Sequence, residues 1–309
     1  MLIPLTHFLR RIPIVTRRVA IINESDNLTA GDLARASAAL QIQVTDQFGP
    51  RWHIIATVDC FPTLQDLPQG YWPVVVRDFI GGPSSGVHVS ETGDKPFALV
   101  VFSGAHWTIT LSHEVLELLA DPFGTTFLTG PSLRTEQTTV EYLAEICDPC
   151  QADKSAYDIN GVLVTDFVTP DFYAGFGAGK YSFGGQVTAP RTVLPGGYIT
   201  WHEAAPDAWW QQLFDGSAPR FQQIDLSELR PDIHLRGLID QKTESVMARA
   251  GKRSGIDAKR LGALRKRSAL VRQAQAQWWQ RQIERVLKPT AQGPVGHGPA
   301  SRNRRTRGK

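Results

Sequence analysis

Residues 97–121 read FALVVFSGAHWTITLSHEVLELLAD, and this stretch decides how the rest of the chain is interpreted. Its first six residues, 97–102, form the most apolar run in the sequence, and we predict a buried strand there. After a short connection, residues 108–120 carry apolar side chains at helical spacing and predict a helix. Asp121-Pro122 ends this helix, because a residue before proline is disfavoured in the helical conformation.

The segments before this stretch predict the rest of a sheet and one more helix. Short apolar or alternating runs predict strands at residues 18–22, 52–58, 74–79 and 86–90. We expect the last of these to be a short edge strand. Residues 28–48 predict a helix, with Thr29 as its N-cap. This order of elements indicates an α+β protein with a mixed β-sheet and helices packed on it.

The remaining sequence divides into regions of different composition. We expect residues 1–122 to form an N-terminal α/β subdomain and residues 123–235 an irregular C-terminal subdomain that completes a cleft. Residues 236–288 are interpreted as basic helices broken near Gly251 and Gly255, and residues 289–309 as a disordered basic tail.

Within the expected irregular subdomain, a few segments predict local structure. Asn160-Gly161 between two β-prone runs predicts a hairpin over residues 157–167. Residues 124–139 are interpreted as an exposed loop, residues 140–146 as a helical turn or two, and residues 204–213 as a short helix.

Charge separates the body of the chain from its C-terminal part. Residues 236–309 hold 19 Lys and Arg against 4 Asp and Glu, whereas residues 1–235 hold 14 against 26. We therefore expect residues 236–309 to contact nucleic acid or an acidic partner, or to pack on the acidic body.

Composition also excludes several classes of protein. No apolar run reaches 18 residues, so a transmembrane helix is not expected. Three cysteines exclude a disulfide scaffold, and Cys147 and Cys150 are interpreted as thiols beside the site. The N-terminus lacks the pattern of a secretory signal, which makes the cytoplasm the expected location.

The chemistry is expected in the predicted helix, at Ser112-His113-Glu114-Val115-Leu116-Glu117. His113 and Glu117 are four residues apart and share one helical face, so they can ligate one metal ion; Zn²⁺ is the expected ion, with other divalent metals as alternatives. Glu114 is placed to accept a proton from a water that the metal polarises. The motif is a variant of H-E-x-x-H with a glutamate in place of the second histidine.

A catalytic zinc site needs a further protein ligand. Glu145 is the leading candidate, and Asp148 lies three residues after it. Asp121 is an alternative ligand or a residue that supports His113 or the helix end. Two more histidines are open candidates, His88 and His106.

This motif, on a helix that follows a mixed sheet, resembles that of the zincin superfamily of metallopeptidases. The order of elements over residues 18–120 is similar to the N-terminal half of the zincin fold. The gluzincin type takes a glutamate from a later helix as third ligand, and Glu145 is the best match here, with Asp148 resembling its supporting acid. The SHExxExxxDP motif and the later ExCD motif also resemble those of a group of uncharacterised bacterial proteins.

Two departures from the zincins stand out. Glu117 replaces a histidine, which adds negative charge and admits harder metals than zinc. The glycine and third histidine of the metzincins and their Met-turn are also missing.

Two hypotheses follow from the residues and the resemblance. The first is a zinc-dependent, peptidase-like metallohydrolase with His113, Glu117 and Glu145 as ligands and Glu114 as general base. Its peptide or protein substrate would extend along residues 87–89. The second is a non-catalytic metal-binding or assembly protein that acts through residues 236–309.

Overall fold

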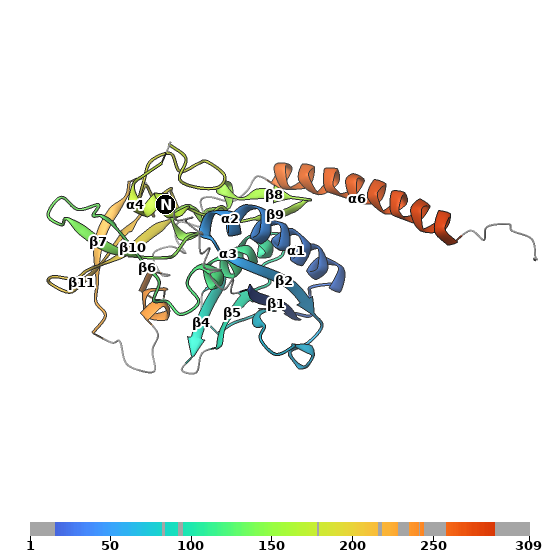
Figure 1. Cartoon of the computed structure of the whole chain (residues 1–309), viewed down its shortest axis with the longest axis horizontal. Coiled ribbons are helices and arrows are strands. Elements are labelled where there is room, and N and C mark those ends of the chain that lie inside the picture. The colour runs from blue at the N-terminus through green and yellow to red at the C-terminus, as the bar shows by residue number, and fades with distance from the viewer. Residues whose placement is uncertain are drawn as a thin grey trace, which may run out of the picture. The chain divides into compact units, whose positions relative to one another are not determined.

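The apolar strand before the HExxE helix is β5 (Lys95–Val101), which lies within a five-stranded sheet of order β2-β1-β3-β5-β4 in the computed structural model (Figure 1). The other strands are β1 (Thr16–Glu24), β2 (Ile55–Phe61), β3 (Trp72–Arg77) and β4 (Gly86–Glu91). β4 pairs antiparallel with β5 at one edge, and the other pairs are parallel. The mixed sheet and its short edge strand are therefore confirmed.

The structure describes residues 16–81, 84–91, 95–177, 179–215, 218–227, 235–240, 242–243 and 258–287. The chain divides into two compact units, Met1–Leu264 and Arg265–Lys309, and both five-stranded sheets belong to the first. Among the described helices, none has the length and apolar character needed to cross a membrane.

Two helices cover one face of the first sheet, α1 (Ala30–Ile42) and α3 (Trp107–Ala120). Alternate strand residues such as Val19 and Val74 share one large core with Leu40 of α1 and Leu111 of α3, whereas Ala20 belongs to a smaller cluster. This period-two alternation is what a sheet requires when only one face carries helices. After α1 the chain continues as a π-helical turn (Gln43–Phe48) and the short helix α2 (Gly49–Trp52).

The start of α1 follows the predicted capping pattern. Thr29 is extended, and its hydroxyl accepts a hydrogen bond from the Asp32 backbone N–H at 3.1 Å. Such a cap satisfies one of the backbone donors that the first helical turn leaves free.

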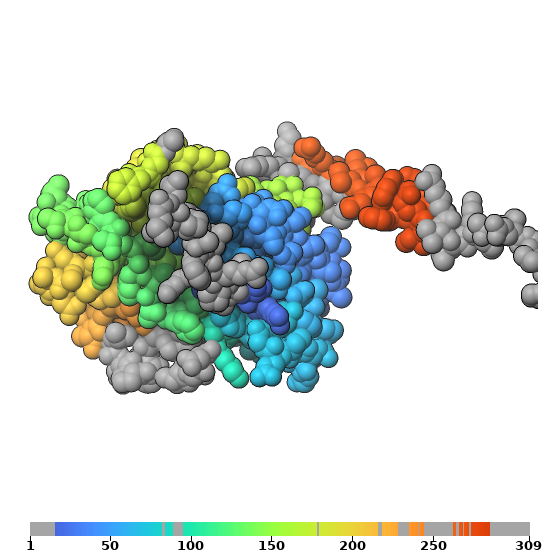
Figure 2. All heavy atoms as spheres, viewed as in Figure 1, coloured from blue at the N-terminus to red at the C-terminus, as the bar shows by residue number. Residues whose placement is uncertain are grey.

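The irregular region expected over residues 123–235 is instead built on a second five-stranded sheet, of order β12-β11-β10-β7-β6 with antiparallel pairs throughout. Its strands are β6 (Phe127–Pro131), β7 (Thr139–Leu143), β10 (Tyr198–Glu203), β11 (Ala208–Leu213) and β12 (Arg220–Ile224). The surface in Figure 2 shows elements of the first sheet, in blue to cyan, beside those of the second, in green to orange.

Three predictions about this region are wrong. Residues 140–146 contain strand rather than helical turns, residues 204–213 contain β11 rather than a helix, and the expected loop over residues 124–139 contains β6. In β7, Val140 and Tyr142 are buried while Thr139 and Glu141 are exposed, which is the period-two pattern of a strand. β6 and β7 pair with each other, as do β10 and β11, so pairing between neighbouring segments makes these residues strands. The alternation in β7 is a strand signal that the sequence itself contains.

The predicted hairpin is confirmed as β8 (Tyr157–Ile159) and β9 (Val162–Val164). Asn160 and Gly161 both have positive φ, 52° and 84°, as a two-residue turn of the primed type requires. A short helix follows, α4 (Pro170–Ala174).

The basic C-terminal region contains a long helix, α6 (Ala258–Leu287), and residues 235–240 are also helical. This agrees with the helices expected in residues 236–288. The expected break near Gly251 and Gly255 and the expected disordered tail at residues 289–309 lie outside the described residues.

Candidate metal centre

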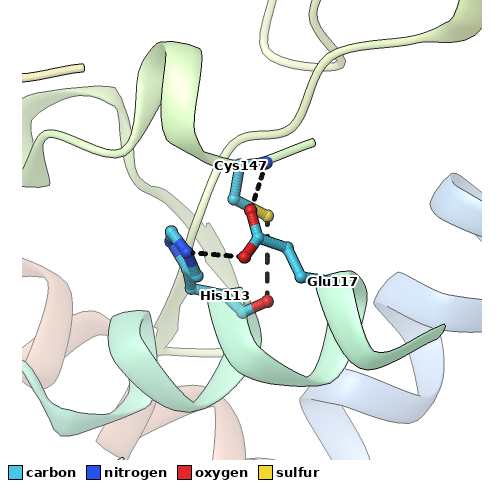
Figure 3. A group of neighbouring side chains, drawn as sticks. All are labelled: His113, Glu117 and Cys147. Atoms are coloured by element: carbon cyan, nitrogen blue, oxygen red, sulfur yellow. Dashed lines mark hydrogen bonds and ion pairs between the residues drawn. The ribbon is translucent and has the colours of Figure 1, made fainter. Parts of the chain in front are cut away.

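Helix α3 directs the motif side chains into the interior of the first unit. His113 and Glu117 lie one turn apart, and His113 Nε2 is 3.0 Å from Glu117 Oε2. The sequence places them there because their i, i+4 spacing puts them on one face. Figure 3 shows both side chains rising from α3 toward the segment that contains Cys147.

The segment after β7 approaches the same face of α3. The Cys147 backbone N–H donates a hydrogen bond to Glu117 Oε1 at 3.0 Å, and Asp148 Oδ1 lies 3.3 Å from His113 Nε2. Ligand atoms of Glu117, Glu145 and Asp148 all lie within 4.8 Å of one another, as do those of His113, Glu117 and Cys147. Residues 30 positions apart in sequence thus meet at Glu117, but His113 and Glu145 do not belong to one group of ligand atoms.

Glu114 points from α3 toward the edge strand β4. Its Oε2 lies 3.6 Å from His88 Nδ1, which is also 4.0 Å from Glu117 Oε2. A Cβ added at Gly86 would lie 2.5 Å from Glu114 Oε1, closer than any side chain tolerates. The glycine therefore makes room for Glu114, and His88 is the open histidine candidate that reaches the site.

Asp121 is engaged at the end of α3. Its Oδ1 accepts hydrogen bonds from the backbone N–H groups of Thr125 and Thr126, each at 2.9 Å. Two roles were expected for Asp121, a metal ligand or a residue that supports His113 or the helix end. These bonds fit support of the helix end. His106 is directed elsewhere and pairs with Asp153 at 3.2 Å.

Two site residues were missed by the sequence analysis, Arg236 and Asp240. The Arg236 guanidinium makes ion pairs with Glu117, Glu145 and Asp240 and is almost completely buried. The charge count had placed Arg236 in the basic C-terminal region. A signal was available, because Arg236 and Asp240 are spaced i, i+4 within a helical segment whose apolar members Leu238 and Ile239 are buried.

Burial and close charges set the ionisation of the centre. Burial would raise the pKa of Glu117, but the charges of His113 and Arg236 lower it overall. Burial would lower the pKa of His113, but Glu117 and Asp148 raise it well above its usual value. Both shifts favour the ionised pair of a Glu117 carboxylate and a His113 imidazolium, so a metal that uses the His113 ring would compete with a proton for it.

Glu114 titrates differently from its neighbour on the helix. Burial raises its pKa to about 8, although the charges of His113 and Arg236 act against the rise. Such a shift in a buried cluster is typical of functional carboxyl groups, and it is also found in purely structural ion-pair networks.

Buried hydroxyl and thiol groups line the rest of the centre. The Tyr173 hydroxyl donates to the Glu145 backbone carbonyl at 3.2 Å, and the Tyr198 hydroxyl donates to Asp240 at 3.4 Å. Burial raises the pKa of the Cys147 and Cys150 thiols well above the usual value. These cysteines are therefore neutral thiols, which agrees with their interpretation as buried groups beside the site.

The donor set fits a divalent cation. It combines one imidazole with carboxylates, a chemistry that zinc and harder metals accept. Within the part of the chain that the structure describes, Glu114 Oε2, Glu145 Oε1 and Asp148 Oδ2 are buried and have no hydrogen-bond partner. Burial raises the pKa of all three groups, because an ionised carboxyl group in this state is costly unless a cation or a donor compensates it.

Comparisons with protein-family models, curated proteins and solved structures found no match to this chain. The resemblance to zincins therefore depends on the motif residues. Any assignment of function has to be argued from the geometry of the centre.

Proposed function

We propose that the centre binds a divalent metal, Zn²⁺ first among them, through His113, Glu117 and Glu145, with Asp148 beside them, and that it hydrolyses a peptide or amide bond. The observation that supports this proposal is that two distant segments meet at Glu117: its carboxylate forms one group of possible ligand atoms with Glu145 and Asp148, and His113 lies within 3.3 Å of both Glu117 and Asp148. Structural packing alone does not require so many acidic groups in one interior position.

A divalent cation at this place would polarise the carbonyl group of the substrate and lower the pKa of a water bound to it. Glu114 lies on the same helix, one residue from His113, and is the carboxyl group that accepts the water's proton. Added positive charge favours its ionised form and so opposes the effect of burial on its pKa. His88 lies beside this carboxyl group, with its Nδ1 3.6 Å from Glu114 Oε2.

The substrate we propose is an extended peptide. In the described part of the first sheet, β4 is an edge strand paired only with β5. An extended chain can add to such an edge through main-chain hydrogen bonds. It would then run past Gly86 and His88, next to Glu114.

The test compares Glu114→Gln with Glu141→Gln, an exposed glutamate on β7, in hydrolysis of a peptide library and in metal content. Glu114→Gln should retain the metal and lose about 10²-fold or more in rate, the usual contribution of a general base. His113→Ala should lose the metal. Full activity of Glu114→Gln on a substrate that the wild type cleaves would refute the mechanism.

A second candidate function, from the basic helix, is that α6 contacts the phosphates and bases of nucleic acid. This helix carries eight Lys and Arg against one glutamate. Trp278 and Trp279 are exposed and lie edge to face with ring centroids 4.5 Å apart. Exposed aromatic rings among basic side chains suit base stacking and phosphate binding.

This candidate is tested in the full chain by replacing both tryptophans with alanine and measuring binding to a labelled single-stranded oligonucleotide at several salt concentrations. We expect at least about a tenfold loss, since stacking contributes about 1–3 kcal/mol per base. Phe221→Ala, another exposed aromatic on β12, is the control. Binding that does not depend on salt or on the tryptophans would contradict this function.

A further inference from the structure

Arg236 occupies the position in the centre where a cation is needed. Its Nη2 contacts Glu117 Oε2, its Nη1 contacts Glu145 Oε2, and its Nε lies 3.3 Å from Asp240 Oδ2. The side chains of Arg236, Glu117 and Glu145 are exposed by 6%, 0% and 2%. A guanidinium so deep in the protein compensates carboxylates that burial would otherwise make costly.

The carboxyl groups that Arg236 contacts are two of the three proposed metal ligands. Glu117 Oε2 faces both Arg236 and His113, and Glu117 Oε1 accepts the Cys147 N–H. Zinc takes its oxygen ligands at about 2.0–2.2 Å, so it competes with the guanidinium for the lone pairs of Glu117 Oε2 and Glu145 Oε2. A second positive charge at this distance is also strongly repelled.

We propose that Arg236 is a built-in counter-ion that competes with the metal for Glu117 and Glu145 and so regulates metal occupancy of the centre. This inference rests on the proposed metal function. When the metal binds, the guanidinium leaves these two carboxylates. Asp240, one turn along the same helical segment at i, i+4, remains as the ion-pair partner of Arg236.

The competition predicts that removal of the guanidinium tightens metal binding. Zn²⁺ titration of the full chain by calorimetry should give at least about tenfold tighter binding for Arg236→Gln than for wild type, and Arg236→Lys should fall between them. Arg134→Gln is the matched control, because Arg134 stacks on Trp210 in the second sheet. Equal or weaker zinc binding by Arg236→Gln would overturn the inference.

A measurement on the wild-type chain covers the case in which Arg236→Gln fails to fold. Phenylglyoxal labels accessible guanidinium groups, and peptide mass analysis reports the rate at Arg236. Saturating Zn²⁺ should accelerate labelling of Arg236 and leave Arg134 unchanged. Unchanged or slower labelling of Arg236 in zinc-bound protein would overturn the inference while leaving the metal function intact. If neither wild type nor Arg236→Gln binds zinc, the metal function itself fails.

Discussion

Glu117 is the residue at which the centre departs from a two-histidine motif, and its contacts supply a physical reason. One carboxyl oxygen accepts the Cys147 backbone N–H, and the other faces His113 and Arg236. A neutral histidine at this position has one acceptor nitrogen and no charge, so it cannot hold these partners together. The glutamate therefore ties the segment after β7 to α3 in addition to any ligand role.

From the buried Glu114 carboxyl group we predict how the free energy of unfolding of the metal-free protein depends on pH. Its folded pKa of about 8 lies above the ordinary glutamate value of 4.5, so between these values the folded state retains a proton that the unfolded state has lost. The stability from this group is complete below the unfolded pKa and is lost as the pH rises toward 8. The loss amounts to about 1.4 kcal/mol per pH unit over this range.

Urea unfolding of chelator-treated protein at about pH 6 and about pH 8 measures this effect. Glu114→Gln, which resembles the protonated acid, should lose on the order of 2 kcal/mol less than wild type between the two conditions. Glu141→Gln should behave like wild type, because that carboxyl group lies in exposed surroundings. Equal pH dependence of the Glu114→Gln and wild-type proteins would show that Glu114 is not buried in this way.

At the level of single residues, local spacing predicted the members of the centre that share a motif. His113 and Glu117 follow from helical periodicity, and the acids of the ExCD motif were identified as candidates beside them. Arg236 could not be found in this way, because its partners are about 90 and 120 positions earlier in the sequence. Tertiary packing brings them together, and a charge count of the chain assigned this arginine to a different region.

At the level of elements, β4 connects the sheet edge with the proposed base. Gly86 begins the strand, and its Cα lies so close to Glu114 and Thr110 that a side chain there would meet both. The edge strand therefore fixes the position of the Glu114 carboxyl by its backbone. This makes the glycine a sensitive test of the geometry around the base.

We expect Gly86→Ala to displace Glu114, to cost about 1–3 kcal/mol of unfolding free energy through overpacking, and to reduce hydrolysis while zinc content is retained. Thermal unfolding, elemental analysis and peptide hydrolysis measure the three effects. Gly262→Ala in α6, where an added Cβ meets nothing within 4 Å, is the control. Wild-type hydrolysis by Gly86→Ala would contradict the proposed place of Glu114.

The elements of the first sheet were predicted from sequence, whereas those of the second were largely missed. β1 and β3 contain consecutive buried apolar residues, and β5 is an apolar run whose residues alternate between buried and half-buried; such runs are recognisable on their own. In β11, Trp209, Gln211 and Gln212 do not produce a clear alternation, and the strand depends on pairing with β10 and β12. The buried Gln211 side chain donates its amide hydrogens to the Thr200 and Thr243 hydroxyls and accepts a hydrogen bond from Gln222.

At the scale of the whole molecule, the centre joins parts of the first unit that are separate in sequence. α3 packs on the first sheet, the segment with Asp148 follows β7 of the second sheet, and Arg236 comes from helical residues after both sheets. Buried charged side chains join these three parts. The free energy of unfolding of the unit should therefore change when a metal ion binds among them.

Zinc should stabilise the first unit as a whole, because the proposed ligands are assembled only in the folded state. At a free concentration of 100 times Kd, binding contributes about 2.7 kcal/mol, which should raise Tm by several degrees relative to chelator-treated protein. Amide hydrogen exchange at residues 144–150 should slow in parallel, because the metal would hold this segment against α3. His113→Ala should show neither response. A zinc-induced rise in Tm of the same size in His113→Ala would show that the ion binds elsewhere. No rise in wild type would show that zinc does not bind the centre and that Arg236 is the cation that compensates its carboxylates.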